Sequence, residues 1–168
     1  TQFYEAFSYC VFKKKPFKNV FSNAQWKHIF LSSKFQYPNL IPLLSGLTAD
    51  ELQGACLNSN ASIYFDHCRF IWNDFKENFG TLFAEDSAVL SLFNYFKNGF
   101  EKQPVDHYFR TILHQMEKDI SYNKIGNYKL CLGNQRPVDV LFKYIKKFIK
   151  STLDQKYFSF CWSSSMTH

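Results

Sequence analysis

The chain has 168 residues, of which 46% are hydrophobic, 20% aromatic and 20% charged, with 20 Phe and 10 Tyr. This composition excludes a disordered tail and suits one globular domain with a buried core. No apolar run reaches the roughly 18 residues that span a bilayer, and the net charge of +6 comes with scattered arginines, which argues against a nucleic-acid groove.

Residues 1–35 form an aromatic and basic segment without a sustained period, ahead of a domain at residues 36–168. The chain begins at Thr1 and lacks the charged start and apolar block of a signal peptide. We interpret this beginning as a missing N-terminus.

Two short helices are predicted at the start of the domain. Pro38 and Gly46 are typical of the first and the terminating residue of a helix. Thr48 is a good N-cap for a second helix through Gln53, and Glu51 completes a capping box.

The middle of the chain predicts a helix, a strand and a helix. Asp66 is the expected cap of a helix whose apolar stripe runs to Phe79. The run TLFAED at residues 81–86 predicts a buried strand with carboxylates at its C-terminal end. A further apolar helix is expected to end near Gly99.

The last part predicts an amphipathic helix over residues 106–120, capped by Asp106, and then a loop-rich stretch. Pro137 is suited to begin another helix, and Tyr157–Trp162 predicts a strand. Helices that alternate with short buried strands indicate an α/β fold with parallel strands. The basic residues at the spacing of a solvated helix face are Lys143, Lys146, Lys147 and Lys150.

The five cysteines show no C-x-x-C spacing, which argues against a zinc ribbon or a thioredoxin-type site. Their odd number leaves one thiol unpaired or paired outside this chain. Asn60 begins an Asn-Ala-Ser glycosylation sequon. Together these features favour the secretory pathway.

Several segments occur in an order that carries a family resemblance: YPNLIPLLSGL, FDHCRFIWNDFKENFGTLFAED, FNYFKNGF, VDHYFR and YFSFCWSSSMTH. Over roughly residues 35–168 the chain resembles the animal family catalogued as domain of unknown function 229. The resemblance implies an extracellular protein similar to alkaline phosphatases and sulfatases. The implied fold is part of a three-layer sandwich with a central mixed, mainly parallel sheet. The implied parent activity is phosphate- or sulfate-ester hydrolysis with zinc, calcium or manganese.

The same resemblance places the nucleophile, a Thr, Ser or formylglycine, two residues before Pro38, where this chain has Gln36. A glutamine amide cannot serve as an alkoxide nucleophile. Residues 1–35 contain no Asp to end a metal-binding strand, and the later Asp-His ligands would lie beyond His168. We therefore expect a partial chain with no catalytic residue, no bound metal and no cofactor of its own.

Three residues are candidates for a substrate pocket. Glu85 and Asp86 end a predicted strand, where active-site groups lie in open α/β sheets. The alternative for Asp86 is a cap on the following helix, and the two roles are compatible. His168 matches a substrate-binding histidine of a related sulfatase, with an ordinary surface histidine as the alternative. The remaining histidines of the predicted helices are interpreted as ordinary: His67, His107 and His114.

Other catalytic chemistries are disfavoured. Glu85 and Asp86 point to opposite faces of a strand, so they cannot flank one glycosidic bond. Ser45 lacks the G-x-S-x-G context, and Cys68 has no base directed at its thiol. Cys68 and Cys131, both at element edges, are a candidate disulfide.

A second function class is a non-catalytic binding module. The basic and aromatic stretch from Lys13 to Phe21 offers a surface for an acidic or anionic partner. No nucleic acid is expected as a partner.

Overall fold

The computed structural model describes residues 36–57, 64–95, 97–120, 122–125 and 128–164. The N-terminal segment at 1–35, with the stretch from Lys13 to Phe21, lies outside the described residues, and so do Asn60 and His168.

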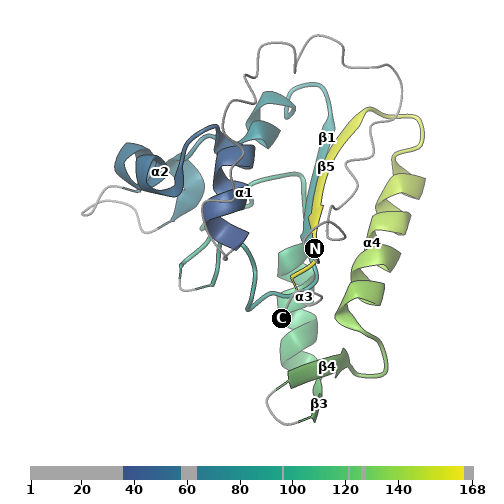
Figure 1. The fold of residues 1–168 in the computed structure, drawn as a ribbon. Coiled ribbons are helices and arrows are strands. Elements are labelled where there is room, and N and C mark those ends of the chain that lie inside the picture. The colour runs from purple at the N-terminus through teal and green to yellow at the C-terminus, as the bar shows by residue number, and fades with distance from the viewer. Residues whose placement is uncertain (1–35, 58–63, 96, 121, 126–127, 165–168) are drawn as a thin grey trace, which may run out of the picture.

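A three-stranded parallel sheet forms the centre of the domain (Figure 1). Its order is β2 (His107–Tyr108), β1 (Gly80–Glu85) and β5 (Tyr157–Trp162). Strand β1 pairs with β5 in register from Gly80↔Tyr157 to Glu85↔Trp162. Both long strands are buried almost throughout, as is typical of parallel strands covered on two faces. The predicted α/β class with parallel strands is confirmed.

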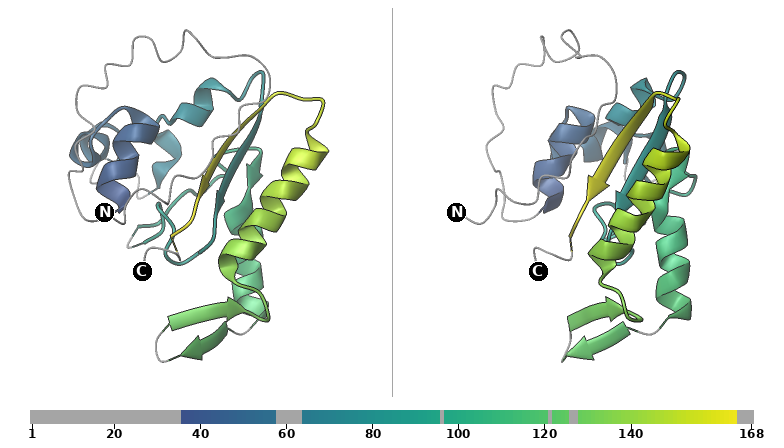
Figure 2. Two further views of the ribbon diagram at one scale, coloured as in Figure 1. Left: turned by 45° about the vertical axis from the view of Figure 1, so that its right-hand side comes forward. Right: turned by 90° about the vertical axis from the view of Figure 1, so that its right-hand side faces the viewer.

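Helices cover both faces of this sheet and make three layers (Figure 2). One face carries α1 (Gln36–Ser45) and α2 (Ala49–Cys56), together with the 3-10 helices η1 (Phe65–His67) and η2 (Ile71–Asp74). The other carries α3 (Phe109–Asp119) and α4 (Pro137–Ser151). A hairpin of β3 (Tyr122–Ile125) and β4 (Tyr128–Leu132) projects from the ends of these two helices.

The high aromatic content fills the core under α1. Phe83 of β1 stacks on Trp72 with ring centroids 5.4 Å apart and on Tyr108 at the same separation. The Phe93 ring contacts the Phe83 ring edge-on, with centroids 5.7 Å apart. Rings in these geometries add to the stability that burial of their area provides. The sheet face under α1 is therefore held by interlocked rings.

Local signals predicted α1, α2 and α4, although α1 begins at Gln36, two residues before Pro38, the predicted first residue. The Thr48 hydroxyl oxygen accepts from the Glu51 N–H at 3.2 Å, and the Thr48 N–H donates to the Glu51 carboxylate at 2.8 Å. This is the predicted capping box. Gly46 follows α1 with a φ of 77°, and Pro137 is the first residue of α4.

The helix predicted from Asp66 to Phe79 is wrong, and two 3-10 helices take its place. Phe70 and Trp72 are both buried, although residues two apart lie on different sides of an α-helix. Asp66 is not a cap, because its carboxylate accepts the N–H groups of Glu101 at 2.8 Å and Lys102 at 2.7 Å. Burial of rings and a distant backbone partner outweigh the helical pattern.

The helix predicted to end near Gly99 is also absent from the described residues of that stretch. In a helix the Leu92 N–H would donate to the Ala88 carbonyl. Instead it donates to the Glu85 carboxylate at 2.6 Å, and the Ala88 carbonyl accepts from the Arg110 guanidinium at 3.3 Å. The Leu92 N–H and the Ala88 carbonyl thus bond to side chains of β1 and α3 and not to each other.

The third long helix begins later than predicted, at Phe109. Asp106 does not cap it, because its carboxylate accepts the backbone N–H of Thr81 at 2.8 Å and the Thr81 hydroxyl at 2.7 Å. His107 and Tyr108 pair with β1 as the edge strand β2. The predicted loop-rich stretch contains the β3–β4 hairpin.

The disulfide predicted between Cys68 and Cys131 is wrong. Cys68 pairs with Cys56, with Cα atoms 5.2 Å apart, and the bond ties α2 to the segment after η1. Cys131 carries a free thiol on β4. Cys68 is buried in the core under α1, whereas the neighbour of Cys131, Leu132, packs in the core of the opposite sheet face.

Candidate functional site

The carboxyl ends of β1 and β5 meet at one edge of the sheet. Because the two strands are parallel and Glu85 pairs with Trp162, the residues that follow each strand also lie side by side. The following residues are Asp86 on one side, and Ser163 and Ser164 on the other. Polar groups from chain segments far apart in sequence are brought together there. We call this set, with Glu85 and Gln36, the carboxyl-edge cluster.

Asp86 joins the two strand ends. Its carboxylate accepts the Ser163 hydroxyl at 2.5 Å, the Ser164 N–H at 2.8 Å and the Ser164 hydroxyl at 3.2 Å. The side chain is fully buried, and a buried carboxylate needs such partners. The described residues 87–95, which come directly after Asp86, form no helix, so the alternative role of Asp86 as a cap on the following helix is wrong. Its role is to fasten the end of β5 to the end of β1.

Glu85 points to the aromatic face and is 2% exposed. One carboxylate oxygen accepts the Leu92 N–H at 2.6 Å, and the other has no hydrogen-bond partner among the described residues. Burial raises the pKa of Glu85 to about 8, although the Leu92 N–H opposes that shift. Near pH 7 this carboxyl is largely protonated, so it can donate a hydrogen bond from within the core.

Tyr108 lies on the same face as Glu85, because it pairs with Phe83, two residues earlier on β1. Its hydroxyl is also buried without a hydrogen-bond partner in the described part of the chain. Burial, and then the charge of Glu85, raise the pKa of Tyr108. A buried carboxyl and a buried phenol thus share a face near the sheet edge.

The loop after β1 is fixed to α3 through Ala88. The Ala88 N–H donates to the Glu117 carboxylate at 3.1 Å, and its carbonyl accepts from Arg110 at 3.3 Å. Ala88 is completely buried. Both backbone groups are therefore satisfied by side chains, and the loop that covers Glu85 is held in place.

Gln36, at the first position of α1, reaches the same edge from the other side. Its amide oxygen accepts the indole N–H of Trp162 at 3.0 Å. The fold therefore brings together three residues that the sequence singled out: Gln36, Glu85 and Asp86. Sequence reasoning missed Tyr108, Trp162, Ser163 and Ser164, although the polar run after the last strand was a signal for the two serines.

The other candidate residues do not join this cluster. His67, His107 and His114 lie on η1, β2 and α3, and none of them hydrogen-bonds a member of the cluster in the described part of the chain. Within the described ranges no group of three or more His, Cys, Asp or Glu residues is placed to hold a metal ion. No helix among the described residues is long and apolar enough to cross a membrane.

These features define a mainly parallel α/β domain with a polar cluster at the carboxyl edge of its sheet. The chain belongs to the family described as Protein of unknown function (DUF229), whose model matches residues 35–168. The comparisons found no match among curated proteins and none among solved structures.

Proposed function

We propose that this chain is a sulfatase- or alkaline-phosphatase-like extracellular protein that does not hydrolyse phosphate or sulfate esters at its carboxyl-edge cluster. The observation that carries the proposal is the hydrogen bond from Trp162 to Gln36. It puts the residue at the nucleophile position of the resemblance beside the carboxyl ends of parallel strands, where open α/β sheets bind ligands.

The side chain at that position argues against covalent catalysis. An amide has no ionisable proton near neutral pH, so Gln36 cannot supply the charged oxygen that attacks phosphorus or sulfur. Its oxygen already accepts from Trp162. The amide nitrogen donates hydrogen bonds and is not a nucleophile towards phosphorus or sulfur. Gln36 therefore does not support turnover.

The divalent metal of the parent superfamily does not fit Glu85 and Asp86 as they are arranged. A metal ligand must be a deprotonated carboxylate with an oxygen directed at the ion. The raised pKa keeps Glu85 largely protonated near pH 7, and both oxygens of Asp86 accept hydrogen bonds from the serines after β5. We derive no metal-dependent step for these residues.

Two features support an extracellular location. The disulfide between Cys56 and Cys68 is of the kind that persists in oxidising compartments. Asn60, outside the described residues, begins a glycosylation sequon. On these two features we include an extracellular location in the proposal.

The test is an assay of the 168-residue chain on p-nitrophenyl phosphate and p-nitrophenyl sulfate, each with zinc, calcium and manganese. We expect no release of p-nitrophenol above the protein-free blank. The Gln36→Ala and Asp86→Asn variants serve as controls for contaminating hydrolases. Turnover that either substitution abolishes would show a competent active site and refute the proposal.

A further inference from the structure

A cavity of about 190 Å³ lies between β2 and the last turns of α4. It is away from the carboxyl-edge cluster, because the ring of its floor residue Phe148 packs against Tyr157, the first residue of β5. Its lining residues are His107, Tyr144, Lys147, Phe148 and Ser151. Except for His107, they recur three or four residues apart and so share one face of α4.

The aromatic floor of this cavity is fixed by the core. The Phe148 ring is buried and lies 5.0 Å from the His107 ring and 5.4 Å from the Tyr157 ring, measured between centroids. The Tyr144 ring stacks on Phe109 at 4.2 Å. The polar groups at the rim are the Lys147 ammonium and the His107 imidazole, both on exposed residues. Both groups are hydrogen-bond donors, and they line the cavity beside the buried Phe148 ring.

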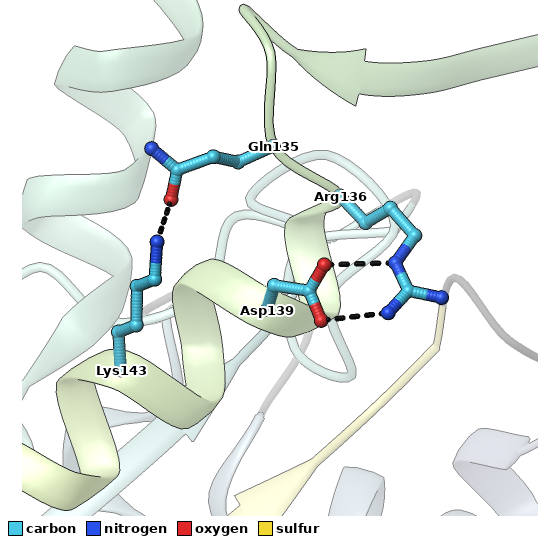
Figure 3. Close-up of polar contacts among 4 residues, drawn as sticks. All are labelled: Gln135, Arg136, Asp139 and Lys143. Atoms are coloured by element: carbon cyan, nitrogen blue, oxygen red, sulfur yellow. Dashed lines mark hydrogen bonds and ion pairs between the residues drawn. The ribbon is translucent and has the colours of Figure 1, made fainter.

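No carboxylate among the described residues forms an ion pair with Lys147. Figure 3 shows how the other charged groups at the start of α4 are used. Asp139 accepts two hydrogen bonds from the Arg136 guanidinium, at 2.8 and 2.9 Å, and Lys143 donates to the Gln135 amide at 2.7 Å. Asp139 is the only acidic residue of α4, and it is paired with Arg136 in the first turn, whereas the cavity lies at the last turns.

The carboxylate that lies nearest to the cavity in sequence is Asp106, which precedes His107. It accepts the Thr81 N–H and hydroxyl. Although burial opposes the shift, these bonds lower the pKa of Asp106, so the carboxylate stays charged. An anion in the cavity therefore depends on the charge of Lys147 to offset that of Asp106.

We propose that this cavity binds a tetrahedral oxyanion, a sulfate or phosphate group, between the Lys147 ammonium and the His107 ring N–H. The group is either a free ion or the charged end of an ester. The row of exposed lysines on α4 continues from the cavity and would extend contact with a longer sulfated or phosphorylated ligand: Lys143, Lys146 and Lys150.

The experiment is an NMR titration of the 168-residue chain with sodium sulfate and sodium phosphate, against sodium chloride at matched ionic strength. We expect saturable shifts of the amide signals of His107 and Lys147. Lys147→Met should weaken binding by about fivefold, since an exposed ion pair contributes up to about 1 kcal/mol. Lys146→Met is the matched control, because it removes the same charge from the same helix outside the cavity, and it should change the affinity less than about twofold.

A second variant tests the other donor. His107→Phe keeps a ring against Phe148 and removes the N–H group, so it should weaken binding with no loss of thermal stability. Equal weakening by Lys147→Met and Lys146→Met, or shifts that do not saturate, would show diffuse charge attraction and overturn the proposal. A sulfated disaccharide that binds more tightly than free sulfate would identify an ester as the source, and equal affinities would identify the free ion.

Discussion

The indole N–H of Trp162 donates a 3.0 Å hydrogen bond to the amide oxygen of Gln36, across 126 positions of the chain. This bond connects the end of β5 to the start of α1. It therefore places Gln36 against the carboxyl edge of the sheet.

We predict that this bond contributes measurably to folding. In a double-mutant cycle with Gln36→Ala and Trp162→Phe, the coupling free energy should be about 0.5–1.5 kcal/mol, the net value of one intramolecular hydrogen bond. Urea denaturation followed by far-ultraviolet circular dichroism gives the four free energies of unfolding. Additive effects of the two substitutions would mean that the bond does not form in solution.

The raised pKa of Glu85 predicts a pH-dependent stability. The carboxyl has a pKa of about 8 in the folded chain and 4.5 as its ordinary value, so the folded state binds more protons between these values. The stability from Glu85 is fully present below about pH 4.5 and is lost as the pH rises to about 8. The slope is at most about 1.4 kcal/mol per pH unit.

Glu85→Gln tests this directly, because the amide is neutral at every pH in that range. We expect the free energy of unfolding to fall less steeply between pH 5 and pH 8 in this variant than in the parent chain. The exposed Glu101→Gln is the matched control and should leave the slope unchanged. An identical slope for parent and Glu85→Gln would contradict the neutral carboxyl.

Asp86 should be among the most sensitive polar positions of the domain. In Asp86→Ala the Ser163 hydroxyl and the Ser164 N–H lose the carboxylate to which they donate. Because the site is buried, we expect the free energy of unfolding to fall by about 2–3 kcal/mol. Asp86→Asn keeps one acceptor oxygen and should cost less. The exposed Asp50→Ala, on α2, is the control for loss of a carboxylate. Equal stability of the three variants would rule out the role of Asp86 at the strand ends.

The disulfide between Cys56 and Cys68 is expected to stabilise the region under α1. It encloses a loop of 12 residues, and closing a loop of that size contributes about 2–3 kcal/mol in the chain-entropy model. The paired Cys56→Ala and Cys68→Ala substitutions should lower the stability by that amount, whereas Cys131→Ala should have little effect. Peptide mapping without reduction should yield the linked peptides of these two cysteines, and a linkage of Cys131 to Cys68 would disprove the pairing.

Local sequence signals were sufficient where a single element satisfied its own backbone. The capping box of Thr48 and Glu51 is completed within four residues, so no distant group can change it. The strand from Tyr157 to Trp162 is apolar at every position except Ser159, and burial on two faces follows from that composition. The same reasoning failed from Ala88 to Leu92, because Arg110 and Glu85 replace the helical partners there.

Periodicity and caps act over a few residues, so the chain's residues were enough to predict the α/β class, the two long parallel strands, α4 and the position of Glu85 and Asp86 at a strand end. Contacts between distant segments set the partner of Cys68, the loss of two expected helices and the binding of Asp86 to the serines after β5. In each case a group could have bonded to a neighbour in sequence or to a distant residue. The distant residue becomes the partner only when the packed sheet brings it within bonding distance.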